Sequence, residues 1–177
     1  MVSTLNRVAA NVHVWNPPGA GTWGLANCVL IDAGTSGEPA LLFDVPYDRP
    51  LTRKLQALAA DLLAPNGAAI GTIVNSHANG DHSYGNGLFP GVDIISTEAN
   101  RQHICAEPSP EELAHLLRVT SRDTPLGWYM GRHFDRYDLT GLKTVGPTST
   151  FSGQMTLRVG DLQVDLYEVG PRTPSAT

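Results

Sequence analysis

The spacing of the hydrophobic residues changes along this chain, and this change limits the fold more than any other feature. Residues 12–15, 28–32 and 40–45 form alternating or β-branched runs, and the stretches between them are rich in turn residues. We therefore expect three strands joined as an antiparallel meander. After Pro50 the pattern takes on helical spacing, with leucines at Leu51, Leu55, Leu58 and Leu62. This stripe predicts a helix that packs on a sheet.

Caps, breaks and turns place the remaining elements. The expected elements are a helix over 50–63 capped by Asp48, strands at 70–75 and 92–96, a single helical turn within 83–88, a helix from Thr97 to about 106, helices over 110–119 and 126–134, and a hairpin of 155–159 with 162–169 around Gly160. The helix over 110–119 has a capping box that begins at Ser109. This order of strands and helices predicts an α/β layered fold.

The composition limits the class of protein. The 177 residues, 41% of them hydrophobic and 16% charged, suit one globular core, and a net charge of −5 offers phosphate groups no basic face. We therefore expect no nucleic-acid partner. The apolar runs are shorter than the roughly 20 residues of a membrane span, so we expect no membrane partner and a cytoplasmic location. We interpret the two cysteines, Cys28 and Cys105, as buried packing residues.

The segment from Asn75 to His82 carries the chemistry. It places His77, Asp81 and His82 directly after an apolar strand. Imidazole and carboxylate groups are suitable ligands for zinc, iron(II) or manganese, and two such metals can share a hydroxide that acts as a nucleophile. The alternative interpretation is a surface loop held by caps and turn hydrogen bonds.

This segment resembles the His-x-His-x-Asp-His loop of the metallo-β-lactamase superfamily, with Asn79 where the second His usually lies. The resemblance extends over the strand end at 42–44, the helix at 50–63, the strand at 72–75, residues 84–86 and residues 166–171. It implies a metallo-β-lactamase-type αββα sandwich. In that fold two sheets pack face to face and helices cover the outside.

The resemblance also implies roles for individual residues. His77 corresponds to a ligand of one metal, whereas Asp81 and His82 correspond to ligands of the other, and Asp81 is the expected catalytic carboxylate. Asp44 resembles an aspartate that supports the metal loop by hydrogen bonding. The carbonyl oxygen of Asn79 would be a poorer ligand than imidazole, and we interpret it as the mark of a subfamily. Zinc, as one or two ions, is the expected cofactor, with iron or manganese as alternatives.

Two features depart from the family pattern. Arg172 stands where a third His is usual, and a guanidinium group cannot bind a metal. The chain ends at Thr177, so we interpret residues 1–177 as a single metallo-β-lactamase-like domain truncated at its C-terminus, with the first sheet and its helices. An incomplete sandwich would expose the apolar inner face of that sheet, to which Ile70, Ile73 and Val74 or their neighbours would contribute. We therefore expect self-association through this face, aggregation or the need for a partner.

Three hypotheses for the function follow. The first is a metal-dependent hydrolase that attacks an ester, thioester, lactone or amide bond of a small-molecule substrate with metal-bound hydroxide. The second is a truncated or decayed homologue without catalysis and with weak or no metal binding. The third is an interaction module. We interpret His13, His103 and His115 as structural, His133 as a minor candidate for a replacement ligand, and residues 21–23 as a candidate substrate-contacting loop.

Overall fold

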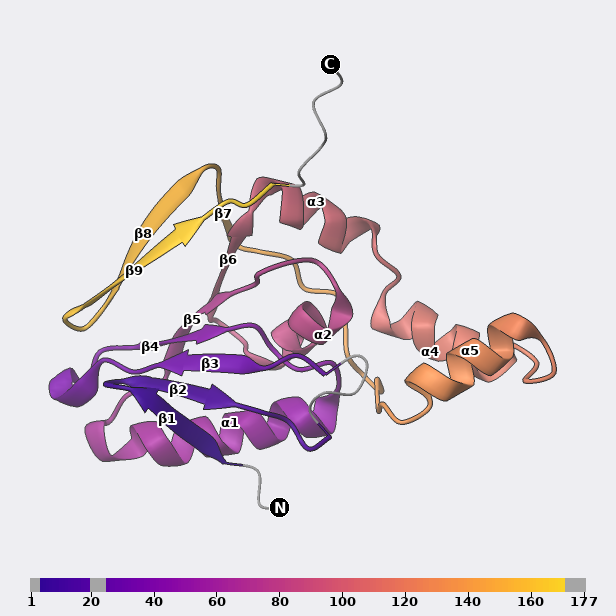
Figure 1. Ribbon diagram of the computed structural model, residues 1–177, viewed down its shortest axis with the longest axis horizontal. Helices are drawn as coiled ribbons and strands as arrows, with labels where there is room; N and C mark the ends of the chain where they lie inside the picture. The colour runs from indigo at the N-terminus through magenta and orange to yellow at the C-terminus, as the bar shows by residue number, and fades with distance from the viewer. Residues whose placement is uncertain (1–3, 20–24, 171–177) are drawn as a thin grey trace.

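A mixed β-sheet forms the body of the protein (Figure 1). The computed structural model describes residues 4–19 and 25–170. Within these residues the sheet has seven strands, which lie side by side in the order in which they occur along the chain. The strands are β1 (Leu5–Ala9), β2 (Val12–Trp15), β3 (Cys28–Ile31), β4 (Ala40–Phe43), β5 (Ile70–Val74), β6 (Asp93–Thr97) and β7 (Ser149–Phe151). Strands β1 to β4 pair antiparallel, which confirms the predicted meander, and β4 to β7 pair parallel.

Helix α1 (Arg49–Leu63) makes the first parallel connection, from β4 to β5. It begins as predicted, because the Asp48 Oδ1 atom accepts a hydrogen bond of 2.9 Å from the Leu51 amide. It ends in a short turn that leads to Gly67, whose φ of 66° lies in the left-handed region that favours glycine. The buried residues of the helix are Thr52, Leu55, Ala59 and Leu63, while the other three predicted leucines pack at the margin of the core.

The two faces of the sheet bury alternate residues of the same strands. Leu42, Ile73 and Ile94 belong to the core cluster that includes the buried face of α1. Their neighbours Leu41, Val74 and Ile95 belong to a second cluster, on the opposite face of the sheet. In Figure 1 the helix α1 lies on one side of the strands, and the hairpin of β8 (Gln154–Val159) and β9 (Leu162–Tyr167) lies on the other.

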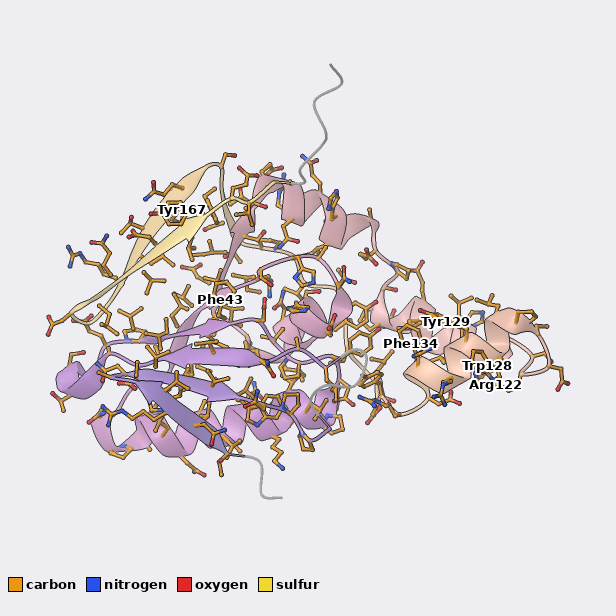
Figure 2. The ribbon with its side chains drawn as sticks, viewed as in Figure 1. Phe43, Arg122, Trp128, Tyr129, Phe134 and Tyr167 are labelled. Carbon is orange, nitrogen blue, oxygen red and sulfur yellow. The ribbon has the colours of Figure 1, made fainter. Side chains whose placement is uncertain are left out.

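The hairpin covers the inner face of the sheet. It turns at Gly160, whose φ of 57° is left-handed, and its Val159 and Leu166 side chains are buried in the second cluster. Phe43 points from the end of β4 into the space beneath it (Figure 2). In the described part of the chain this second sheet has only two strands. The predicted α/β fold, with one large sheet and the beginning of a second, is therefore confirmed.

The predicted exposure of two strand residues is wrong. Ile73 and Val74 are 0% and 3% exposed. Ile73 faces the α1 side of the sheet and Val74 faces the hairpin, so a different layer covers each residue. The hairpin that folds back on the sheet covers Val74, whereas Ile73 is covered by the helix that the leucine stripe predicts.

The remaining helices lie beyond the sheet. They are α2 (Gly80–Ser83), α3 (Glu98–Ala106), α4 (Pro110–Val119) and α5 (Pro125–Phe134). Helices α4 and α5 form an arm that extends away from the body (Figure 1), and Trp128 and Tyr129 are exposed on it (Figure 2). The capping box at Ser109 is present as predicted. No helix in the described ranges is long and apolar enough to cross a membrane.

The two cysteines differ in their surroundings. Cys28 is fully buried in the main core, as predicted. The prediction for Cys105 is wrong, because this residue lies on the solvent-facing side of α3 and is exposed. A helix of mixed polarity presents only part of its surface to the core, and Ile104 occupies that part of α3.

Candidate metal centre

The candidate site lies where β4 and β5 end. These two strands are parallel neighbours, so the residues that follow them meet at the same edge of the sheet. The Asp44 amide donates to the Val74 carbonyl oxygen at 2.8 Å. This bond brings Asp44 beside Ser76, at the start of the loop that carries the histidines. Asp44 has a φ of 62°, a left-handed conformation that aspartate tolerates better than most residues.

Asp44 holds this loop through both of its carboxylate oxygens. Its Oδ1 atom accepts from the Ser76 amide at 2.7 Å. Its Oδ2 atom accepts from the Ser76 hydroxyl at 2.7 Å and from Nδ1 of His82 at 2.8 Å. The carboxylate is 5% exposed, so these bonds replace the water that it has lost.

His82 is oriented by the two carboxylates around it. With Nδ1 bonded to Asp44, its other ring nitrogen, Nε2, faces Oδ2 of Asp81 at 3.5 Å. Burial by itself would lower the pKa of His82, but the hydrogen bonds and charges of Asp44 and Asp81 raise it to about 9. Burial would likewise raise the pKa of Asp81, yet the contact with His82 lowers it. In the metal-free site His82 is therefore cationic and Asp81 anionic at neutral pH.

His77 stacks on this pair. Its ring centroid lies 3.8 Å from that of His82, with the ring planes tilted by 47°. The hydroxyl of Ser76 lies 3.0 Å from Nδ1 of His77. The other ring nitrogen of His77, Nε2, does not contact this hydroxyl. Desolvation and the charge of His82 lower the pKa of His77, so its imidazole is neutral at neutral pH. A neutral imidazole is the form that binds a metal.

The loop fits a metal in the type of its donors but not in their number. His77, Asp81 and His82 offer the nitrogen and oxygen donors that zinc takes, and Asp44 fixes the ring of His82 as a metal-binding histidine requires. Across residues 4–19 and 25–170, however, no three His, Cys, Asp or Glu side chains are placed to hold one ion. Asn79 is exposed and precedes α2, with no hydrogen bond from its side chain to that helix.

Three buried asparagines lie beneath the loop, and sequence reasoning gave them no role. Asn75 Nδ2 donates to the backbone oxygen of His82 at 2.7 Å, and Asn75 and Asn86 exchange amide hydrogen bonds of 2.9 and 3.2 Å. Asn86 also donates to the Val145 oxygen, and Asn100 donates to the Asn75 oxygen. These bonds tie the metal loop to α3 and to the segment before β7. The signal available in the sequence was an amide directly after the apolar β5 run.

A cavity of about 420 Å³ opens beside the loop. Its lining residues are Tyr47, Asn79, Gly80, Asp81, Tyr84, Glu107, Pro108, Leu113 and Phe134. Gly80 lies between two rings: a Cβ atom there would come within 2.8 Å of Tyr84 and 2.9 Å of Tyr47. A larger residue at this position would have to displace these two rings. The cavity thus shares Asn79 and Asp81 with the candidate metal loop.

The other histidines lie away from the loop. His13 is buried and bonds to Asp32 at 2.8 Å, which confirms a structural role. His103 and His115 are exposed on α3 and α4, and His133 stacks on Tyr129 at 4.7 Å. None of the four belongs to a metal-binding group in the described part of the chain. Arg172 and residues 21–23 lie outside the described residues.

Solved structures show which class of fold this is. A metallo-beta-lactamase from Pontibacter korlensis superposes with a TM-score of 0.58 over 94% of this chain and 60% of its own length, at 12% identity. TMB-1 superposes with a TM-score of 0.50 over 92% of this chain and 58% of its own, at 16% identity. The fold is that of the metallo-β-lactamases, and the chain spans about 60% of the length of these solved relatives.

The sequence places the chain in a family. The model of the Metallo-beta-lactamase superfamily matches residues 21–152, which include β3, β4, α1 and the histidine loop. The chain therefore belongs to the metallo-β-lactamase superfamily. No curated protein matches it significantly.

Proposed function

We propose that this chain is a metal-dependent hydrolase that cleaves an ester, thioester, lactone or amide bond in a small molecule. One observation carries the proposal: Asp44, His82 and Asp81 form a continuous chain of contacts at the end of the parallel strands, with His77 stacked on it. Membership of the superfamily supports metal-dependent hydrolysis. The bond that is cleaved and the activity of the whole protein are part of the proposal.

Each loop residue has a proposed task. His77, Asp81 and His82 would hold the metal, for which we propose zinc, and the amide oxygen of Asn79 is a weaker fourth donor that would mark a subfamily. When bound, a metal of this type activates water and polarises a carbonyl group. Asp44 orients His82 through its 2.8 Å bond. Asp81, ionised at neutral pH because the contact with His82 lowers its pKa, is the proposed catalytic carboxylate and would accept a proton from the attacking water at Oδ2.

The test combines metal content with activity. The protein is purified in the presence of zinc, passed through gel filtration and analysed for metal, then assayed with ester, thioester, lactone and amide substrates. We expect hydrolysis of at least one class and fewer than two metals per chain, because the described donors are too few for two ions. Two tightly bound metals would contradict the stoichiometry. Asp81→Asn should abolish turnover, whereas Asp61→Asn, on the exposed side of α1, serves as the control.

The second candidate is a non-catalytic homologue. It is favoured by the finding that, among the residues described, no three donors meet at one point. This candidate predicts no turnover with any substrate class at any zinc concentration. Turnover that requires zinc and is lost in Asp81→Asn would exclude it. The predicted cytoplasmic location remains a proposal under both candidates.

A further inference from the structure

The walls of the cavity beside the metal loop are largely aromatic. Tyr47 follows β4, Tyr84 follows α2 and Phe134 ends α5. The ring of Tyr47 lies at the centre of this group, 5.1 Å from the ring of Tyr84 and 6.1 Å from that of Phe134. Tyr84 is held in place because its hydroxyl donates to the Pro108 oxygen. A volume of about 420 Å³ is in the range of small-molecule sites.

The charged groups in this cavity are all negative. They are Asp81, which already faces His82, and Glu107, and no Lys, Arg or His lines the cavity. Glu107 makes no ion pair within the part of the chain that the structure describes. It is also the C-cap of α3, where the negative end of the helix dipole disfavours a carboxylate. A cation in the cavity would pair with the Glu107 carboxylate and would offset its unfavourable interaction with the helix dipole.

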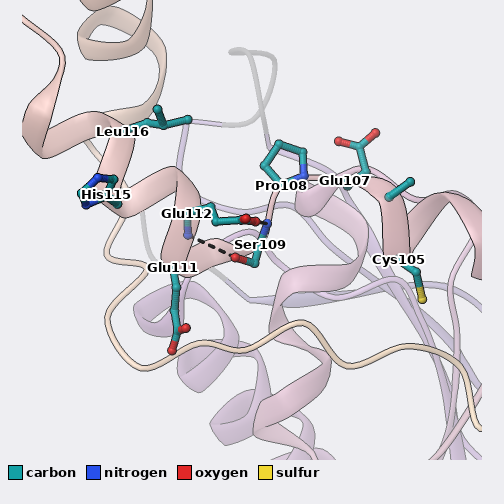
Figure 3. A pocket seen from close by; sticks show the side chains of 9 residues that line it. Cys105, Glu107, Pro108, Ser109, Glu111, Glu112, His115 and Leu116 are labelled. Carbon is teal, nitrogen blue, oxygen red and sulfur yellow. Dashed lines mark hydrogen bonds between the residues drawn. The ribbon is translucent and has the colours of Figure 1, made fainter.

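The electronegative surface continues outside the cavity. A wider groove of about 880 Å³ between α3 and α4 shares Glu107 and Pro108 with the cavity and adds Glu111 and Glu112 (Figure 3). Glu112 is occupied, because its carboxylate accepts from the Ser109 amide at 2.8 Å. Neither Lys nor Arg lines this groove, and its lining includes the imidazole of His115. An approaching cation would therefore be attracted along the groove towards Glu107, and an anion would be repelled.

From these observations we propose that the cavity binds the cationic ammonium group of the substrate, which Glu107 pairs with and the rings of Tyr47, Tyr84 and Phe134 surround. The proposal rests on the proposed function, since it names the class of substrate: an ester, thioester, lactone or amide that carries an ammonium group beside the reacting carbonyl. Aromatic faces and an unpaired carboxylate both favour a cation. The same lining disfavours substrates that carry a carboxylate on this side.

The first experiment measures binding without catalysis. Choline is titrated calorimetrically into the full chain at physiological ionic strength, and its affinity is compared with that of the neutral alcohol in which carbon replaces the ammonium nitrogen. We expect choline to bind at least about tenfold more tightly, which corresponds to about 1.4 kcal/mol. Equal affinities, or tighter binding of the neutral alcohol, would overturn the proposal.

Two variants and a matched control locate the cation. Glu107→Gln should weaken choline binding about fivefold, because an exposed ion pair is worth about 1 kcal/mol. Phe134→Leu, on a half-buried ring, should weaken it about threefold by removing a cation–π contact. Glu111→Gln removes the same charge from the neighbouring groove but not from the cavity, and should change the affinity by less than about twofold. Equal losses in the two glutamate variants would show a general charge effect and refute the site.

A second experiment separates this inference from the proposed function. The zinc-loaded protein is assayed with acetylthiocholine and with the neutral thioester of the same shape. We expect a kcat/KM ratio of about ten in favour of the cation, falling about fivefold in Glu107→Gln. If choline binds as described but neither thioester is cleaved, the inference stands and thioester hydrolysis fails. If the neutral thioester is cleaved equally well and choline does not bind, hydrolysis stands and the inference fails.

Discussion

Replacement of Asp44 by asparagine tests the support of the metal loop. The asparagine keeps the size of the side chain and tolerates the left-handed backbone at this position. Its amide oxygen can still accept from the Ser76 amide, but its NH₂ group then faces Nδ1 of His82, which donates to Asp44 in the native protein. Two donors would meet, so the ring of His82 loses its partner. We expect both stability and metal affinity to fall.

The pKa of His82 gives the size of the effect on stability. Its value of about 9 lies above the ordinary value of 6.5, and at about 1.4 kcal/mol per unit this corresponds to roughly 3 kcal/mol of stabilisation in the metal-free protein. Because the folded-state pKa is the higher one, this stabilisation is complete below pH 6.5 and is lost as the pH rises through about 9. Because Asp81 still contacts His82 in the variant, part of this stabilisation remains. Asp44→Asn should therefore lower the free energy of unfolding by about 2 kcal/mol near pH 6 and by less near pH 10.

The measurement is urea unfolding of the chelator-treated protein at several pH values, together with a competitive zinc titration. Asp32→Asn is the matched control, because Asp32 bonds to His13 at the same 2.8 Å but lies away from the loop. Asp44→Asn should weaken zinc binding about tenfold to a hundredfold, and Asp32→Asn should leave it unchanged. A stability loss in Asp44→Asn that is constant with pH, or equal zinc affinities in the two variants, would refute this account of the loop.

Three further predictions concern the core, the metal ligands and assembly. Leu55→Ala in α1 should lower the free energy of unfolding by about 3 kcal/mol, because Leu55 is fully buried, and Leu58→Ala should lower it by less than about 2 kcal/mol. Equal losses in urea unfolding would contradict the observed orientation of α1, in which Leu55 faces the core and Leu58 lies at its margin. His82→Ala should weaken zinc binding more than His103→Ala or His115→Ala in calorimetric titration. Similar losses in all three variants would contradict the assignment of His82 as a metal ligand. Light scattering at micromolar concentration should detect self-association through the apolar side chains exposed on the arm, such as Val119, Leu126 and Trp128, because the hairpin covers the inner face of the sheet; a monomer that binds no apolar dye would contradict this expectation.

Local signals in the sequence were sufficient for most of the elements. The N-caps at Asp48, Thr97 and Ser109 each accept the backbone hydrogen bond expected of them. The hairpin turn at Gly160 also lies where the alternating pattern predicts it. These features depend on a few adjacent residues, so a single sequence contains the information that forms them.

Elements that depend on distant contacts were missed. Strand β1 is an edge strand with four of its five residues exposed, so it has no apolar pattern. Strand β7 has three residues and is positioned by pairing with β6 and by Thr148, whose hydroxyl accepts from the Ile94 amide. Neither the strand order of the sheet nor the strands that pair with β1 and β7 can be predicted from such short segments.

For the candidate site too, the sequence predicted the residues of one motif but not the contacts between distant segments. The resemblance placed Asp44, His77, Asp81 and His82 together before any geometry was known, and the structure brings these four side chains into contact or close approach. The amide contacts between Asn75 and Asn86 were not foreseen, because the partner of a buried amide is chosen by tertiary packing. The cavity was missed for the same reason: its walls come from four stretches of the sequence, at residues 47, 79–84, 107–113 and 134.

The order of the strands in the sheet has a consequence for folding. Because β1 to β6 lie side by side in chain order, each new strand emerging from the ribosome can pair with the one made just before it, at a small cost in loop closure. Leu41, Val74 and Ile95 are in place by then, but the hairpin that covers them is synthesised more than fifty residues later. The nascent chain therefore passes through a stage with a formed sheet and one uncovered apolar face. Such a stage is the kind of intermediate that chaperones bind and that aggregates when synthesis outpaces them.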